Sequence, residues 1–150
     1  MIVEATMRIV LAFLTLLAFL EPAAAQIVSE RDSQAQRIGG RWIGRYFYAG
    51  LHAAKPPVEF EFTLQVPTAG KVTGRSSEPN SVSPFSAPFL YANIRGDIIG
   101  NALRCVATYD GTGGVTHSSS LIGTFNENWT TLIGTWRVNE EFGGRFEMRR

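Results

Sequence analysis

The sequence has a single cysteine, Cys105, and only two histidines, His52 and His117, among its 150 residues. One cysteine cannot form an internal disulfide, so the hydrophobic core must stabilise the fold. The two histidines are far apart and no HxH or CxxC spacing is present, so neither a metal site nor a cofactor is predicted. Cys105 lies in a strand-like run, residues 103–109, which favours a small buried side chain over a reactive thiol.

An excess of charge of either sign is also lacking. Fourteen Lys and Arg residues balance 13 Asp and Glu residues to a net charge of +1, and the basic residues are scattered along the chain. Neither a nucleic acid nor an anionic membrane is therefore an expected partner. The sequence contains no GxGxxG or P-loop spacing and no G-x-S-x-G motif, which argues against a phosphate-binding loop and a serine hydrolase.

The start of the chain carries the pattern of an export signal. Arg8 precedes an apolar run of 12 residues, 9–20, which is followed by Pro22 and three alanines ending at Ala25. A membrane-spanning helix needs roughly 20 apolar residues, so this run favours a signal peptide, and an uncleaved anchor or a buried helix is the alternative. We therefore predict a signal peptide over residues 1–25, cleavage after Ala25, and a periplasmic or extracellular protein with no membrane attachment.

The rest of the chain is predicted to be one all-β domain. Residues 26–40 are polar and end in Gly39-Gly40, which indicates a flexible lead before a β-domain over 41–150. Segment 58–66 alternates apolar and polar residues without a fault, as expected for a strand with one buried face. Weaker strand patterns, separated by turn signals, occur at 42–48, 71–77, 90–94 with 98–101, 102–109, 115–125, 130–138 and 145–149.

This order of strands predicts a single antiparallel up-and-down meander of about eight strands, closed or nearly closed into a barrel. A β-sandwich is the alternative. Glycines recur inside strand-like surroundings at Gly44, Gly74, Gly100, Gly123 and Gly134. Glycine weakens a strand interior, so its repeated use there favours a curved sheet with close approaches between chain segments.

Four short motifs carry a family resemblance: residues 77–80 (SEPN), 109–118 (YDGTGGVTHS), 134–136 (GTW) and 144–148 (GRFEM). Together they resemble a recurring unit of small bacterial exported β proteins without an assigned activity. The expected architecture is also similar to the calycin kind of barrel, that of avidins and lipocalins. The disulfide pattern common in lipocalins is absent, and an avidin's biotin-holding residues have no counterparts here, so the resemblance implies a fold and not a ligand.

Aromatic side chains are the first candidates for a binding site. Trp42, Tyr46 and Tyr48 share one parity of the first strand, and Trp136 lies near the end of the chain. These rings meet if the first and last strands pair. They then form either a packed aromatic core or a pocket for a small apolar or aromatic compound, oriented by the polar tips of Tyr and Trp.

Glu78, Tyr109 and His117 are the polar candidates. Glu78 begins a Pro-rich stretch, residues 78–88, that is too long for a hairpin turn and is expected to be a loop. A solvated surface carboxylate is the simpler interpretation of Glu78. Proton transfer would require Glu78, Tyr109 and His117 to converge in one pocket.

Three classes of function remain open. The first is a non-enzymatic small-molecule-binding protein, the second is a module that contacts a protein partner through a loop or strand edge, and the third is a small acid-base enzyme. No catalytic residue is assigned. The expected ligand-binding residues are Trp42, Tyr46, Tyr48, Glu78, Tyr109, His117 and Trp136.

Overall fold

The computed structural model describes residues 23–81 and 86–150. These residues form one helix, eight strands and two 3-10 turns. In chain order they are α2 (Ala23–Ile38), β1 (Gly40–Tyr48), η2 (Gly50–His52), β2 (Val58–Gln65), β3 (Lys71–Pro79), β4 (Phe89–Ile99), β5 (Ala102–Tyr109), η3 (Thr112–Gly114), β6 (Ser118–Phe125), β7 (Thr131–Arg137) and β8 (Gly143–Arg149).

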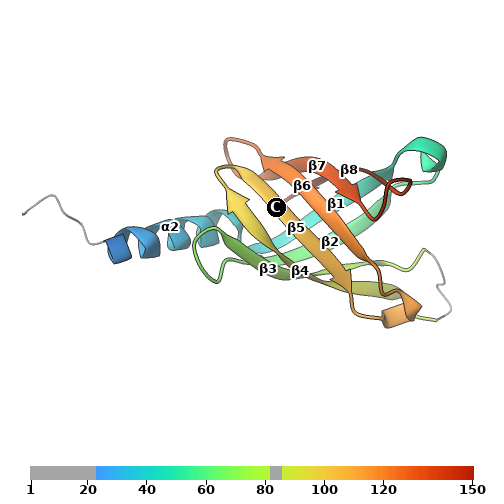
Figure 1. Cartoon of the computed structure of the whole chain (residues 1–150), viewed down its shortest axis with the longest axis horizontal. Helices are drawn as coiled ribbons and strands as arrows, with labels where there is room; N and C mark the ends of the chain where they lie inside the picture. The colour runs from blue at the N-terminus through green and yellow to red at the C-terminus, as the bar shows by residue number, and fades with distance from the viewer. Residues whose placement is uncertain (1–22, 82–85) are drawn as a thin grey trace, which may run out of the picture.

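The eight strands form a closed antiparallel barrel in the order of the sequence (Figure 1). Each strand pairs with the next, and β1 pairs with β8, placing Tyr46 opposite Phe146. The expected all-β up-and-down barrel is therefore confirmed, and the alternative of a sandwich is excluded. Closure also leaves no unpaired edge in the sheet, which removes the usual route to edge-to-edge aggregation.

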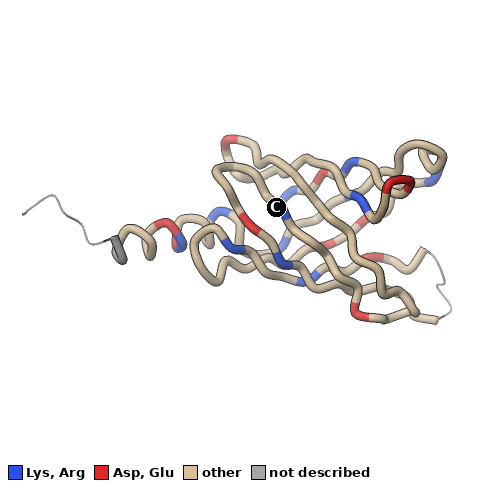
Figure 2. The backbone as a smooth tube through the Cα atoms, viewed as in Figure 1, with Lys and Arg blue, Asp and Glu red and all other residues tan. Residues whose placement is uncertain are grey.

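Alternation along each strand separates the interior of the barrel from its surface. In β2, Phe60 and its neighbours of the same parity are buried, whereas Glu59 faces outward. The outward carboxylates pair with cations of β1, with 2.8 Å between Arg45 and Glu59 and 2.7 Å between Arg41 and Glu61. Lys and Arg positions are interspersed with Asp and Glu positions along the helix and the barrel strands (Figure 2). Exposed pairs of this kind contribute roughly 0–1 kcal/mol each, so the apolar interior dominates stability.

Four of the five recurring glycines lie inside strands, as expected, but Gly100 lies in the turn between β4 and β5. At Gly44 in β1, an added Cβ would lie 2.5 Å from the Phe60 ring, so the absence of a side chain makes room for that ring inside the barrel. Gly100 instead has a φ of +61°, a left-handed turn conformation that glycine adopts without strain.

The segment expected to be a flexible lead is helical. Helix α2 runs from Ala23 to Ile38 and extends outward from one end of the barrel (Figure 1). Only the last turn of the helix, with Ala35 and Ile38, packs against the barrel core. The rest of the helix therefore needs no apolar stripe, and its sequence has none. The expected cleavage site after Ala25 lies inside this helix, and residues 1–22 of the expected signal lie outside the described part of the chain.

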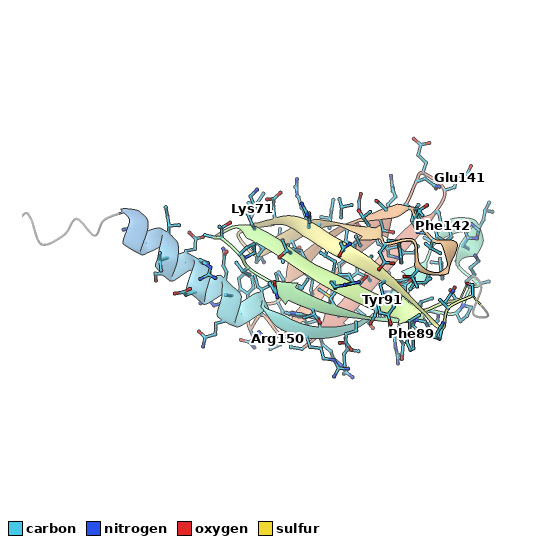
Figure 3. All side chains as sticks on the ribbon, turned by 90° about the horizontal axis from the view of Figure 1, so that it is seen from below. Lys71, Phe89, Tyr91, Glu141, Phe142 and Arg150 are labelled. Atoms are coloured by element: carbon cyan, nitrogen blue, oxygen red, sulfur yellow. The ribbon has the colours of Figure 1, made fainter. Side chains whose placement is uncertain are left out.

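Trp42 of β1 and Arg150, which follows β8, hold the C-terminal end of α2. The Trp42 indole Nε1 donates to the Ile38 carbonyl at 2.8 Å, and the Arg150 guanidinium donates to the carbonyls of Gln36 and Arg37 at 2.9 and 2.7 Å. Figure 3 shows Arg150 at this junction, with Phe142 at the opposite end of the barrel. Cationic donors suit the negative end of a helix dipole and satisfy carbonyls that lack partners within the helix.

Most strand boundaries lie within two residues of the expected ones, and two differences are larger. The fourth strand is continuous from Phe89 to Ile99 rather than interrupted at residues 95–97, and β6 begins at Ser118 rather than at Val115. Among residues 23–81 and 86–150, no helix has the length and apolar character needed to cross a bilayer.

We expect Arg150→Gln to release the end of α2 without unfolding the barrel, because it removes the cation that donates to two terminal carbonyls. Amide hydrogen exchange over residues 30–38 should accelerate about tenfold while the strand amides keep their protection. Arg149→Gln, on the outward face of β8, is the matched control. Equal exchange rates in the two variants would show that Arg150 does not anchor the helix.

Candidate functional site

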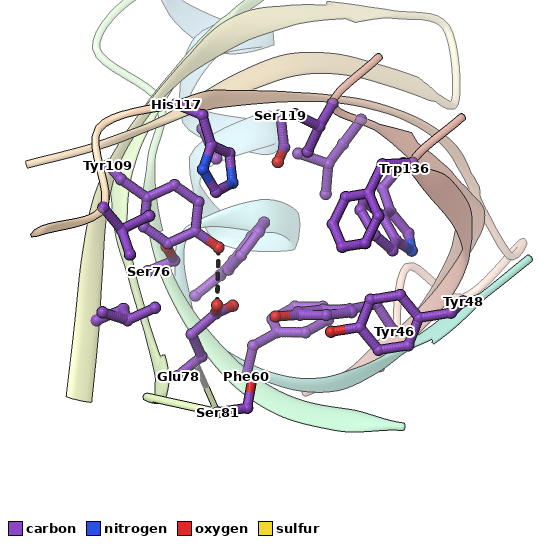
Figure 4. Close-up of a pocket in the computed structure, with 17 residues that line it drawn as sticks. Tyr46, Tyr48, Phe60, Ser76, Glu78, Ser81, Tyr109, His117, Ser119 and Trp136 are labelled. Atoms are coloured by element: carbon purple, nitrogen blue, oxygen red, sulfur yellow. Dashed lines mark hydrogen bonds between the residues drawn. The ribbon is translucent and has the colours of Figure 1, made fainter. Parts of the chain in front are cut away.

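A cavity of about 90 Å³ lies inside the barrel at the end opposite α2 (Figure 4). It is bounded by the last residues of β1, β3 and β5 and by the loops before β6 and β8. Aromatic side chains are the most frequent kind in its wall. The rings that line it are those of Tyr46, Tyr48, Phe60, Phe62, Tyr109, Trp136 and Phe142.

The cavity exists because small side chains occupy inward positions on three strands. These are Ser76 on β3, Ala107 on β5 and Ser119 on β6, all of which line the space. Ala107 and Ser119 are directly opposite one another in the β5–β6 register, so two neighbouring strands leave the same layer of the barrel unfilled. In a small barrel, interior volume is either filled by side chains or available to a ligand.

Tyr46 and Tyr48 of β1 and Trp136 of β7 form an aromatic wall on one side of the cavity. Tyr46 lies 5.1 Å from Trp136 and Tyr48 lies 5.6 Å from it, measured between ring centroids. The Trp136 Nε1 donates to the Phe47 carbonyl at 3.1 Å, which fixes the indole across the end of β8. This reach requires Gly144, where an added Cβ would collide with the Phe47 carbonyl and lie 3.2 Å from the Trp136 Nε1.

Glu78 is the only acidic side chain among the described residues of the cavity wall. Strand β3 continues through Pro79, so Glu78 lies in a strand with an inward side chain that is 7% exposed, and not in a solvated loop as its simpler interpretation held. Its Oε1 accepts a hydrogen bond from the Tyr109 hydroxyl at 2.8 Å, shown by the dashed line in Figure 4. Pairing with neighbouring β4 positions this segment of β3, with Glu78 opposite Leu90.

Burial controls the titration of this cluster. It raises the pKa of Glu78, and hydrogen bonds from the hydroxyls of Tyr46 and Tyr109 oppose that rise by stabilising the carboxylate. Burial, followed by the negative charge of Glu78, raises the pKa of both tyrosines, so their hydroxyls remain protonated donors. The cavity therefore presents two phenol donors around a single carboxyl group.

The rim is lined by His117 and Phe142. The His117 ring lies 4.8 Å from the Tyr109 ring, and partial burial lowers the pKa of His117, which favours the neutral imidazole. Phe142 packs against Tyr48 at 5.5 Å between centroids. Just outside, the Lys55 ammonium lies 5.3 Å from the Tyr48 ring and 5.5 Å from the Phe142 ring.

The structure brings six of the seven candidate residues to this cavity, all except Trp42. Trp42 is fully buried near the α2 end, with its ring 5.6 Å from Phe125. It shares its strand parity with Tyr46 and Tyr48, but parity fixes only the face of the sheet and not the height along the barrel. Strand β1 is long enough to place these residues at opposite ends of the interior.

Several lining residues were not among the candidates. Phe60 and Phe62 belong to the alternating run of β2, so their parity could have identified them as inward facing. Ser76, Ala107 and Ser119 carried no signal, because a small residue marks a cavity only when its neighbours across the barrel are known. Cys105 also faces inward, and burial raises the pKa of its thiol to about 12, as expected for an unreactive core residue.

No family model matches the sequence, and no curated protein matches it. Solved structures do match in fold. A redesigned β-barrel, mFAP1, bound to DFHBI has a TM-score of 0.60 and 11% identity, covering 77% of this chain and 97% of that chain. The redesigned barrel b11L5F_LGL has a TM-score of 0.62 and 9% identity, covering 77% and 93%.

A fluorescence-activating β-barrel designed de novo has a TM-score of 0.55 and 12% identity, covering 78% of this chain and 96% of that chain. At such low identity these similarities show the barrel fold alone. Membership in a family of bacterial exported proteins stays a prediction. Among the described residues, no three His, Cys, Asp or Glu side chains cluster as metal ligands would.

Because the pKa of Glu78 is raised, we expect the thermal stability of the protein to depend on the ionisation of this side chain. A carboxyl group whose pKa is higher in the folded chain stabilises the fold below its unfolded-state value, 4.5, and this contribution is lost as the pH rises through the folded-state pKa. Glu78→Gln keeps an oxygen that can accept from Tyr109 and cannot ionise. We therefore expect the variant to gain in Tm over the native protein as the pH rises above 4.5, by a few degrees for roughly 1 kcal/mol.

Thermal melts of both proteins from pH 4.5 upward measure this difference. Subtracting the two curves removes the titration of every shared group, including Asp110, whose pKa is lowered mainly by hydrogen bonds with Thr112. A Tm difference that does not change with pH would contradict the assignment of Glu78 as a buried, titrating group.

Proposed function

We propose that this protein is a non-enzymatic binding protein that holds a small molecule in the cavity lined by Ser76, Ala107 and Ser119. The observation that carries the proposal is the cavity itself, an aromatic space with a few convergent polar groups at the open end of a closed barrel. That combination is the usual composition of a small-molecule site. The fixed barrel strands supply a preformed site, which lowers the entropic cost of binding.

Two of the structurally similar barrels support this proposal. One is bound to DFHBI, and the other is described as fluorescence-activating. They support the idea that a barrel of this architecture can accommodate a small compound, while the identity of the compound for this chain must come from its own side chains.

Acid-base catalysis is the second candidate, favoured by the convergence of Glu78, Tyr109 and His117 on one cavity. Binding accounts better for the protonation states. The pKa of Tyr109 is raised by burial and by Glu78, which keeps its proton in place near neutral pH, and the Glu78 carboxyl is already engaged by the Tyr109 hydroxyl. Proton transfer works best when the pKa of the transferring group lies near the working pH.

Export is the second part of the proposal. It is supported by the pattern of residues 8–25, with a charge, an apolar run, Pro22 and a small-residue site. Expression in a secretion-competent bacterium should yield a protein whose mature N-terminus is Gln26, as determined by intact mass. Replacing Ala23 and Ala25 with bulky residues should block this cleavage. Retention of the full chain by the unmodified protein would contradict the signal assignment.

Ligand binding should raise the Tm and change the emission of Trp136, which lines the cavity. We expect one-ring compounds such as phenol and toluene to produce both responses, with about 2.7 kcal/mol of stabilisation at a concentration 100 times the Kd. Ala107→Leu, which fills the cavity, should abolish both. Val106→Leu, on the outward face of the same strand, is the matched control and should leave them intact.

Trp136→Phe separates the two readouts, because it should remove the emission response while keeping the rise in Tm. Trp42 lies near the other end of the barrel and should not respond to the ligand. A rise in Tm that survives Ala107→Leu would place binding elsewhere. If no compound has any effect, the protein-partner alternative becomes the better one, with exposed Phe89 and Tyr91 as the first surface to examine (Figure 3).

A further inference from the structure

Glu78 has no cationic partner within the described part of the chain. The ion pairs found there all lie on the outside of the molecule and involve other carboxylates. Of the residues that line the cavity in the described ranges, only Glu78 and His117 can carry a formal charge near neutral pH, and the pKa of His117 is lowered. A buried carboxylate without a counter-ion is costly, so the cavity is poised to accept a positive charge from outside the chain.

The aromatic wall favours the same kind of ligand. Tyr46, Tyr48 and Trp136 lie within 5.1 to 5.9 Å of one another in centroid separation, and Figure 4 shows Tyr48 and Trp136 across the cavity from Tyr109 and Glu78. Rings grouped in this way attract cations through their negative faces, and the attraction grows when water is excluded.

One cation of the chain already uses the rim of this wall. The Lys55 ammonium lies over the rings of Tyr48 and Phe142, at 5.3 and 5.5 Å from their centroids. Lys55 does not line the cavity, so it occupies the outside of the aromatic pair and leaves the inner space open. The same rings can therefore present one surface to Lys55 and another to a ligand.

The volume limits the size of the buried group. A dry cavity of roughly 150 Å³ is known to take up benzene. The space of about 90 Å³ beside Glu78 is smaller but opens at the rim, so it takes one compact group, a single ring or a head group, with the rest of the ligand directed toward the rim. Ammonium and trimethylammonium groups have this compact shape and the required charge.

We infer that the cavity binds a small organic cation, with its ammonium group beside the Glu78 carboxylate and against the rings of Tyr46, Tyr48 and Trp136. This inference rests on the proposed binding function and specifies the chemical class of the ligand. Tyr46 and Tyr109 act as positioning residues, because their hydroxyls donate to the carboxylate and so stabilise its charged form. A cation supplies the counter-ion that the barrel itself does not.

The test compares choline with 3,3-dimethylbutan-1-ol, which has the same shape but a carbon in place of the charged nitrogen. Isothermal titration calorimetry on the purified protein should give an affinity for choline at least about tenfold higher than that for the alcohol. Glu78→Gln should remove this preference by weakening choline binding about tenfold while leaving the alcohol nearly unaffected. Glu147→Gln, which removes an equal charge from the outward face of β8, should preserve the preference.

Tyr48→Leu provides an independent variant at the rim. It should weaken choline binding more than alcohol binding, because it removes a ring face but keeps the apolar surface. Equal affinities for choline and the alcohol in the native protein, or an unchanged preference in Glu78→Gln, would overturn the cation assignment. Binding of phenol or toluene without any binding of choline would also overturn it, and would leave the binding function standing. If none of the four compounds binds, the binding function fails with it.

Discussion

The pairing of β1 with β8 is the contact on which the rest of the molecule depends. It converts a meander into a closed surface with one interior, so every side chain of inward parity must share that space. It also brings the beginning and end of the domain together. Tyr46 belongs to the first strand and Trp136 to the seventh, yet their ring centroids lie within 5.1 Å. The aromatic wall is therefore a product of closure and has no counterpart in any single strand.

The two ends of the interior differ because their inward side chains differ in size. Near α2, Ile38, Trp42 and Phe125 fill the space. At the opposite end, Ser76, Ala107 and Ser119 leave it unfilled. The same barrel thus has one packed end, near α2, and one end with a cavity. Packing at the α2 end stabilises the barrel, which allows the other end to carry polar groups that a fully packed core would exclude.

At Glu78, the protonation state that favours stability differs from the one that favours cation binding. Its burial opposes ionisation, and the Tyr109 hydroxyl compensates only part of the lost hydration. A carboxyl group in this position contributes least to the fold in the charged state, which is the state suited to binding a cation. Such trade-offs are common where a site requires a polar group that the fold alone would not retain.

Local pattern determined much of the architecture. The period of two in residues 58–66, the turn signals and the short strands were sufficient to predict an antiparallel meander, because side-chain alternation is a property of each strand alone. The shared parity of Tyr46 and Tyr48 likewise predicted that both would face the same side. Tertiary structure decided the rest. The C-terminal end of helix α2 is contacted by Arg150, whose guanidinium reaches the Arg37 carbonyl from 113 positions away.

The burial of Glu78, the separation of Trp42 from the site and the volume of the cavity are also properties of the closed barrel. Each depends on height along the barrel and on the sizes of residues from several strands. Parity gives the face on which a side chain lies, but the register between strands sets which side chains share a layer. That is why the sequence identified six residues that line the cavity, and only the structure showed the others and the open space between them.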